Sequence, residues 1–382
     1  MQFGRIGSWR GVTASKRARY GAPAVVLVAV AAGAAVPSIS GAAASPPTLP
    51  ALSVEQLVAD VAQAKAPALS GTLTWSPNLG LSALSTLQSE LGGSSASTGS
   101  GFDPLTLLSG SSKVNVWLGG PKEERLALIT GPSSEVDLVR NANQAWIWDS
   151  TNQRVEHFVG PASGSSLPGT GPVAGLVPTP QQVASRVLSK ISLTTSVTEG
   201  PAVYVAGQPA YQLVVTPKEP STVSSISIAV GSSGPLLGVP LQVAVYARGV
   251  TLPALELGFT GSLNLGAPSA SEFNFVAPPG SKVVTHQLGL AMMGGQPFGS
   301  LPTGLGASGT GWATVVHGTS SSLTSASAQA ALAAVTTPVQ VAGEQARLFS
   351  TYLLNVLVMP NGRFYAGFVT PSALEAAASQ GA

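Results

Sequence analysis

The side chains best suited to acid–base chemistry or metal binding in this chain are three histidines, and their spacing supports neither role. His157, His286 and His317 are scattered along 382 residues, so they lack the short, regular spacing of a zinc site. The sequence has no Gly-x-Ser-x-Gly turn for a serine nucleophile and no Ser-x-x-Lys set with its partner motifs. We therefore expect a protein that is not an enzyme and that holds no cofactor and no metal.

One glycine pattern formally matches a nucleotide-binding loop. Residues 304–309 read Gly-Leu-Gly-Ala-Ser-Gly, which fits the Gly-x-Gly-x-x-Gly fingerprint of dinucleotide-binding proteins. That fingerprint follows a strand and precedes an acidic residue that binds the ribose. Here it follows Pro302 in a glycine-rich stretch, and the next acidic residue is Glu344. We interpret the match as a consequence of composition, not as a nucleotide site.

The most informative residues are two tryptophans in a predicted β-hairpin. Trp146 and Trp148 are two positions apart, so on a strand both indoles leave the same face. Asn141–Asn143 precedes them and supplies residues that tolerate the left-handed backbone of a tight turn. Two neighbouring indoles make a large apolar wall, which either closes a core or lines an apolar pocket.

Apolar residues on neighbouring predicted strands extend this wall into a candidate ligand-binding cavity. The candidate set is Trp75, Trp117, Leu126, Leu128, Trp146, Trp148 and Phe158. An aromatic stripe is more often ordinary core than ligand wall, and the core is the alternative here. Arg140 and Arg154 flank the tryptophan strand. They are either exposed strand charges or polar latches whose guanidinium donors bond carbonyls of a lid or ligand.

The composition favours a β-rich protein of low charge. Hydrophobic residues make up 44% of the chain and charged residues 9%, against a usual charged fraction of about 25%. The 44 glycines and 30 prolines favour many short strands joined by loops. Of the 18 Lys and Arg, five precede residue 45, and the remaining 13 stand against 16 Asp and Glu. Because those 13 cations are not clustered in sequence, we expect no nucleic-acid binding.

The N-terminal segment, residues 1–44, has the three features of a secretory signal peptide. Its five cations precede the apolar run Ala22–Val36, and Ala42–Ala44 offers small residues for cleavage near Ala44. We expect an exported, extracytoplasmic protein. The alternative is an uncleaved N-terminal anchor, although a run of 15 residues is short for a membrane span of about 20. The chain has no cysteine, so disulfides and a cysteine-linked lipid anchor are excluded.

Alternating apolar residues predict a long antiparallel meander with two capped helices. Ser53–Gln56 and Thr179–Gln182 are capping boxes, and we expect their helices to reach about residues 64 and 191. Residues 78–110 are either a lid or a disordered surface loop, and Glu123–Arg125 are expected at a solvated turn. The predicted strands are 69–76, 113–118, 125–130, 135–140, 145–149, 154–159, 195–199, 201–205, 210–216, 225–230, 241–248 and 255–263.

A smaller C-terminal unit is predicted beyond a main domain of residues 45–284. Residues 285–310 are rich in Gly, Ser and Pro and are interpreted as a linker. Within residues 311–382 we predict strands at 311–317, 350–358 and 363–369 and helices at 328–334 and 371–378. Asn361–Gly362, between the last two strands, is a strong hairpin signal.

These motifs together resemble the LolA/LolB-like lipoprotein-carrier superfamily, in particular the LolA-like proteins of high-GC Gram-positive bacteria. The N-terminal domain of the RseB/MucB regulators and the LppX/LprG lipid carriers are related to that superfamily. The segments that carry the resemblance are Arg125–Leu128, Glu135–Asn141, Trp146–Asp149, Thr179–Gln182, Phe273–Gly280, Trp312–Val316 and Leu353–Val369.

The resemblance implies an α+β fold: a half-open antiparallel β-barrel capped by helices, with a small C-terminal α+β extension. Its apolar cavity is expected to shelter acyl chains of a lipid or lipoprotein and to carry them without catalysis. The alternative that it implies is an envelope-stress sensor of the RseB/MucB type, which regulates an anti-sigma factor. The expected partners are acyl chains and, for the sensor, a membrane-anchored protein. We expect a monomer.

Overall fold

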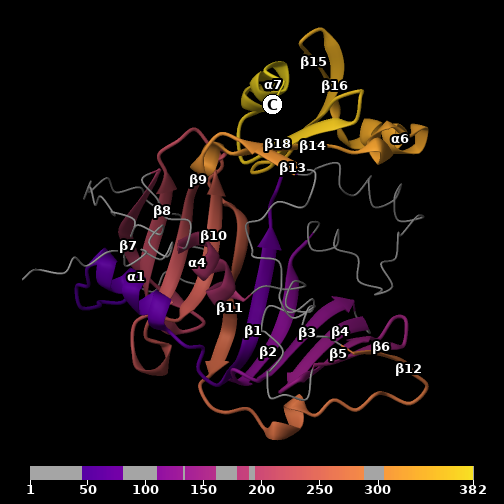
Figure 1. The fold of residues 1–382 in the computed structure, drawn as a ribbon. Coiled ribbons are helices and arrows are strands. Elements are labelled where there is room, and N and C mark those ends of the chain that lie inside the picture. The colour runs from indigo at the N-terminus through magenta and orange to yellow at the C-terminus, as the bar shows by residue number, and fades with distance from the viewer. Residues whose placement is uncertain are drawn as a thin grey trace, which may run out of the picture.

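The chain forms two β-sheets. The computed structural model describes residues 45–80, 110–131, 134–160, 179–188, 194–287 and 305–381. Twelve strands make the first sheet and six make the second (Figure 1). The expected signal peptide and nearly all of the 78–110 segment lie outside these residues. No helix within the described ranges is long and apolar enough to cross a membrane.

The first sheet and its helices are built from residues 54–287. The elements are α1 (Val54–Gln63), β1 (Leu69–Pro77), β2 (Ser112–Gly120), β3 (Glu123–Gly131), β4 (Ser134–Asn141), β5 (Gln144–Asp149), β6 (Arg154–Val159), α4 (Pro180–Leu188), β7 (Thr195–Val205), β8 (Gln208–Pro217), β9 (Val223–Gly231), η1 (Gly234–Leu236), β10 (Pro240–Ala247), β11 (Pro253–Asn264), η2 (Ala270–Phe273) and β12 (Lys282–Gln287). The two strands predicted at 195–199 and 201–205 are one strand, β7, with a register shift between Gly200 and Val203.

The first sheet is open and mixed. Its strand order is β12-β6-β5-β4-β3-β2-β1-β11-β10-β9-β8-β7, so the edge strands β12 and β7 do not meet. Neighbouring strands are antiparallel except β12, which pairs with β6 in parallel. The expected half-open sheet is confirmed, but the expected purely antiparallel barrel is wrong at this edge. The chain returns from β11 across the sheet before it enters β12, and it therefore runs in the same direction as β6.

Helices α1 and α4 cover one face of the β7–β10 half of this sheet (Figure 1). Ser53 Oγ accepts a hydrogen bond from the Gln56 backbone N–H at 3.2 Å, which caps α1 as predicted. The buried stripe of α1, Leu57 and Val61, packs into a core beneath it. One cross-strand row of that core runs through Leu213, Ile228 and Val243 on adjacent strands. We name the face that carries this row the inner face.

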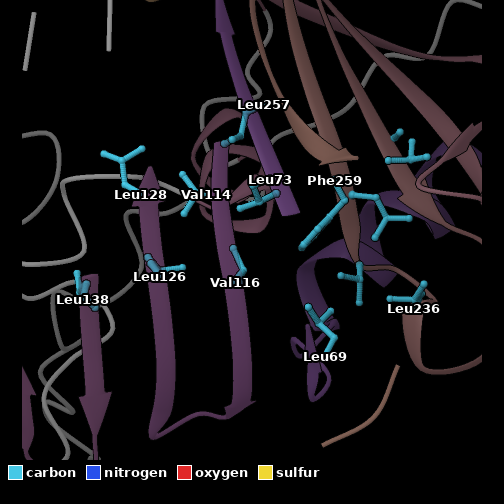
Figure 2. Close-up of a cluster of buried hydrophobic side chains, with 14 of the residues drawn as sticks. Leu69, Leu73, Val114, Val116, Leu126, Leu128, Leu138, Leu236, Leu257 and Phe259 are labelled. Atoms are coloured by element: carbon cyan, nitrogen blue, oxygen red, sulfur yellow. The ribbon is translucent and has the colours of Figure 1, made fainter. Parts of the chain in front are cut away.

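The inner face continues as an apolar face across β1–β4 and reaches Ile147 on β5, and beyond it β5 and β6 carry Asp149, Arg154 and Glu156 on the same face. One row is Leu73, Val114, Leu128 and Val136, and the next is Val116, Leu126, Leu138 and Ile147. Apart from the half-buried Ile147, these side chains are buried. They join one hydrophobic cluster, in which Figure 2 shows Leu126, Leu128 and Leu138 on adjacent strands. Period-two alternation therefore places the apolar side of β1, β2, β3 and β4 on the same face.

The opposite, outer face of β2–β6 is crossed by residues 265–281, which we name the strap. Its short helix η2 contacts β3 and β4. Phe273 is buried, 1% exposed, and its backbone carbonyl accepts a hydrogen bond from Asn141 Nδ2. In Figure 1 this segment leaves β11, passes the lower end of the sheet and leads into β12. The strap therefore links two strands that are far apart in the sheet order.

The second sheet has the strand order β13-β14-β18-β17-β16-β15 and is antiparallel. Its elements are β13 (Leu305–Ser308), η3 (Gly311–Ala313), β14 (Val315–Thr319), η4 (Ser321–Thr324), α6 (Ala326–Val335), β15 (Thr337–Val341), β16 (Glu344–Ser350), β17 (Asn355–Val358), β18 (Arg363–Gly367) and α7 (Pro371–Ser379). Helix α7 packs on β15, β17 and β18, and Leu374 and Tyr365 are fully buried in the core between them.

Several C-terminal predictions need correction. The expected linker 285–310 contains the end of β12 and all of β13, and the strand expected at 350–358 begins only at Asn355. The sequence does not predict the β15–β16 hairpin, because apolar and polar residues alternate only weakly there and most positions of β15 are exposed. The predicted hairpin at Asn361–Gly362 is confirmed, with Val358 opposite Phe364.

The second sheet is fixed to one end of the first. Leu353 is 2% exposed and belongs to the core beneath α1 and α4. The Trp312 indole N–H donates to Thr195 Oγ1 at 2.9 Å, and the Trp312 backbone N–H donates to the Glu219 carboxylate at 3.0 Å. The Phe368 carbonyl accepts bonds from residues 221 and 222. Apolar burial and several hydrogen bonds thus hold the two sheets together.

Candidate functional site

The seven apolar candidates divide between the two faces of the first sheet. Strand pairing places Trp75, Leu126, Leu128 and Phe158 on the inner face. It places Trp117, Trp146 and Trp148 on the outer face, because Trp117 lies opposite Arg125 and Trp146 lies opposite Val139. The prediction that Trp146 and Trp148 share a face is confirmed. The prediction that all seven line one cavity is wrong, because β5 presents Ala145 and Ile147 to the inner face instead.

On the outer face, the tryptophans pack with aromatic and charged groups under the strap. The Trp146 ring stacks on His157 with 5.0 Å between ring centroids and 3° between planes, and Phe275 of the strap lies 6.1 Å away. Trp148 is 9% exposed. The indole of Trp117 lies 5.1 Å from the Arg125 guanidinium. Trp146 thus contacts the strap directly, and this packing corresponds to the predicted alternative in which the aromatic residues are ordinary core.

Arg125 is the ionic centre of that contact, and the solvated turn predicted at Glu123–Arg125 is wrong because these residues open β3. It donates two hydrogen bonds to the Asp137 carboxylate, at 3.1 and 2.8 Å, and pairs with Glu272 of the strap at 2.8 Å. Burial raises the pKa of Asp137, and the Arg125 guanidinium opposes that rise. The turn is instead at Pro121–Lys122, two residues earlier. The signal that could have revealed Arg125 is its even spacing from Ala127 and Ile129 on one strand.

At one end of the inner face, the apolar rows are followed by a row that contains charge. Leu118, Glu124 and Arg140 lie opposite one another on β2, β3 and β4, one step beyond Val116, Leu126 and Leu138. A pocket of about 610 Å³ opens here. We name it the rim pocket. Its lining is Lys65, Ala66, Leu118, Gly120, Pro121, Glu124, Arg140, Thr179, Gln181, Gln182, Ser185 and Arg186.

The helical wall of the rim pocket is held by the second capping box. Thr179 Oγ1 accepts from the Gln182 backbone N–H at 3.3 Å, and Gln182 Oε1 accepts from the Thr179 backbone N–H at 3.0 Å. Pro180 occupies the first helical position. These bonds confirm the predicted start of α4. Gln181 Nε2 also donates to the Ala64 carbonyl at 2.9 Å, which ties α4 to the residues that follow α1.

The two arginines proposed as latches make different contacts. Arg140 is 8% exposed; it donates to the Pro121 carbonyl at 3.0 Å and pairs with Glu124 at 3.3 Å, beside the rim pocket. Arg154 pairs with Glu156, which also bonds His286 Nε2 at 2.5 Å. Arg154 therefore belongs to the β6–β12 edge and not to the pocket. Whether Arg140 bonds a ligand stays a prediction.

The histidines and acidic groups offer no catalytic arrangement within the described ranges. His157 Nε2 bonds Gln144 Oε1 at 2.9 Å, and burial lowers the pKa of this imidazole. His317 stacks near Tyr365 in the second sheet. No group of three or more His, Asp or Glu that could hold a metal ion is found among the residues that the structure describes. What the inner face and rim pocket can do chemically is bind an apolar group next to a polar one.

Comparison with known proteins gives distant structural likenesses. No protein-family model matches the chain, and no curated protein matches it significantly. The MucA/MucB complex of Pseudomonas aeruginosa is 16% identical with a TM-score of 0.39, covering 85% of this chain and 94% of that one. A putative outer membrane lipoprotein-sorting protein domain from Vibrio parahaemolyticus is 9% identical with a TM-score of 0.20, covering 81% and 87%.

A third likeness is to an uncharacterized conserved protein from Thermus thermophilus. It is 8% identical with a TM-score of 0.31, and the match covers 61% of this chain and 98% of that one. At such identities, what these proteins bind is not transferred to this chain. The narrower expectation of a high-GC Gram-positive subgroup stays a prediction. The chain is thus distantly similar in structure to MucB and to lipoprotein-sorting domains.

Proposed function

We propose that this chain is an exported, non-enzymatic binding protein that holds the acyl chain of a lipid or lipoprotein along its inner face. The observation that carries the proposal is the apolar inner face of β1–β4, whose side chains form one buried hydrophobic cluster and which ends at a pocket that contains charge. A surface that changes from apolar to polar along the strands matches a ligand with an apolar tail and a polar end. Trp75, Leu126, Leu128 and Phe158 are the proposed contacts from the predicted set.

The magnitudes are consistent with acyl-chain binding. Burying one methylene group gains about 0.8 kcal/mol, whereas association costs on the order of 4–15 kcal/mol in lost freedom of motion. Between about 5 and 19 buried methylenes are therefore needed before binding becomes favourable by this contribution alone. The acyl chains of lipids reach such numbers, so they are the expected cargo.

A sensor is the second candidate, and the fixed junction between the sheets favours it. Leu353 of the C-terminal part is buried in the core beneath α1 and α4, next to the inner face. A ligand that displaces side chains of that core therefore also displaces Leu353, which belongs to the C-terminal part. In this version the same acyl chain is a signal, and the second sheet binds an envelope protein such as an anti-sigma factor.

Native mass spectrometry of the mature protein, purified from its own envelope, tests the proposal. We expect a bound acylated molecule that extraction removes and that returns when lipid is supplied. Leu126→Ala should reduce the retained lipid while circular dichroism remains that of a folded protein. Leu374→Ala is the matched control, because it truncates an equally buried leucine in the other sheet and should leave lipid retention unchanged.

Two results would contradict the proposal. The first is a wild-type protein that is empty and takes up no lipid when it is offered. The second is equal loss of lipid in the inner-face variant and in the Leu374→Ala control, since lipid retention would then follow stability and not the inner face. A co-purified membrane protein found without any lipid would favour a sensor that does not use the inner face as a binding site.

A further inference from the structure

The rim pocket differs from the rest of the inner face in its charge. Three cationic side chains line it, Lys65, Arg140 and Arg186, against the single carboxylate of Glu124. The chain after residue 44 has 13 basic and 16 acidic residues. Three of those 13 cations thus converge on one pocket in a part of the chain that is acidic overall. Charged groups of one sign in a recess raise the local concentration of ligands of the opposite sign.

We propose that the rim pocket binds an oxyanion, such as a phosphate, carried as the polar head of the ligand whose tail lies on the inner face. This inference rests on the proposed function and names the class of its ligand: an anionic amphiphile. The position of the pocket supports it, because Leu118, Glu124 and Arg140 directly follow the apolar row Val116, Leu126 and Leu138. Head and tail then occupy consecutive positions along the same strands.

The walls of the pocket are fixed before any ligand arrives. On the sheet side, Arg140 is held by the Pro121 carbonyl and by Glu124. On the helix side, the bond from Gln181 to Ala64 fixes α4 beside Lys65. Because the Arg140 side chain is already positioned, it loses little conformational freedom on binding, so more of its electrostatic attraction remains as affinity. Arg140 and Arg186 contribute the delocalised positive charge of guanidinium groups to the pocket lining, and Lys65 adds a point charge.

The lining also argues for a head group of moderate size over a bare ion. About 610 Å³ is several times the space that a single phosphate fills, and Ser185, Gln181 and Gln182 add hydroxyl and amide groups. Leu118 and Ala66 supply apolar wall on the side that joins the inner face. A free inorganic phosphate would satisfy the cations alone and leave these contacts unused.

The test measures two amphiphiles of equal chain length on the full mature protein: dodecyl phosphate and the neutral monolauroyl glycerol, each kept below its micelle concentration. Isothermal titration calorimetry should give a dissociation constant about 10-fold or more lower for the phosphate. In Lys65→Gln/Arg186→Gln that preference should fall below about 2-fold, because binding of the phosphate weakens more than binding of the neutral lipid. Lys113→Gln is the matched control, since Lys113 is exposed on the outer side of β2.

Each outcome decides between the claims. Equal binding of both amphiphiles to the wild type, or an unchanged preference in the double variant, would overturn the head-group assignment and leave the proposed function intact. Binding of neither amphiphile would overturn both. Inorganic phosphate alone is the third ligand. If it displaces dodecyl phosphate at equal concentration, the pocket binds a free anion, and the assignment to the head group of an amphiphile is overturned. No displacement by a large excess of phosphate supports the amphiphile.

Discussion

Removing the Arg125 side chain should destabilise the first sheet strongly at neutral pH. Arg125 is the partner of a buried carboxylate. The Asp137 side chain is 6% exposed, and each of its two carboxylate oxygens accepts a hydrogen bond from the Arg125 guanidinium. Removing one partner of a buried ion pair costs about 3–5 kcal/mol. The Arg125 side chain is itself 28% exposed, so solvent screens part of the attraction, and we expect about 2–3 kcal/mol for Arg125→Met.

The cost should depend on pH in a defined direction. Burial already raises the pKa of Asp137 from its ordinary value of 3.8, and loss of the guanidinium raises it further. A carboxyl group whose pKa is raised by folding destabilises the protein above that raised value, where the folded state must hold the buried charge. This destabilisation disappears as the pH falls toward 3.8, the pKa of Asp137 in the unfolded chain. The cost of Arg125→Met should therefore be full at about pH 7 and smaller at about pH 4.

Guanidinium chloride unfolding, followed by tryptophan fluorescence at both pH values, measures this cost. Arg125→Met/Asp137→Leu should recover at least half of the lost stability, because the uncompensated charge is removed with its partner. Arg363→Met, which removes a guanidinium that stacks on Tyr365 in the second sheet, is a control expected to cost about 1 kcal/mol or less. The reasoning is refuted by a cost below about 0.5 kcal/mol for Arg125→Met at neutral pH, or by equal costs at the two pH values.

Three further variants test other contacts. Gly362→Ala should cost about 1 kcal/mol or more in thermal unfolding, because φ is +81° and a Cβ would lie 2.6 Å from the Ser320 carbonyl oxygen; no loss would contradict this. Leu353→Ala should cost about 2–4 kcal/mol and expose the junction of the sheets to limited proteolysis, and an unchanged cleavage pattern would disprove the coupling. Burial raises the pKa of Glu156, but bonds from His286 and Arg154 outweigh it and lower the pKa below 4.5. The ionised Glu156 therefore stabilises the fold at pH values above its ordinary pKa, and this stabilisation is lost as the pH falls through its pKa in the folded protein. His286→Ala should speed amide exchange of β12 at about pH 6, with little further effect near pH 3.

Most strands and both capped helices could be predicted because their signals are local. The Thr179–Gln182 box needs four residues to be recognised, and the structure shows both of its hydrogen bonds. The faces of the strands could not be assigned in the same way. Strand β5 carries Ala145 and Ile147 on one side and Trp146 and Trp148 on the other, so both sides are apolar. Alternation alone cannot then tell which side faces the helices.

The remaining errors come from contacts between distant segments. The strap covers Trp146 with Phe275, a residue more than a hundred positions later in the chain, and no local pattern at β5 indicates it. In the same way, Arg125 appeared solvated because Glu272, one of its partners, belongs to that strap. The rim pocket was missed altogether. Lys65 follows α1 and Arg186 lies in α4, and only the packed fold brings them together with Arg140.

The arrangement of β11, the strap and β12 has a consequence for the order of folding. The six-stranded half β1–β6 has two open edges, and both are completed by the single stretch of residues 253–287: β11 pairs with β1 and β12 pairs with β6. Until that stretch has been synthesised, this half carries two unpaired strand edges, each a template for pairing with another chain. Contacts between segments so far apart also form slowly. Chains truncated before residue 253 should therefore aggregate more than the full chain, because their two sheet halves have four edges, whereas the complete first sheet has two, β12 and β7.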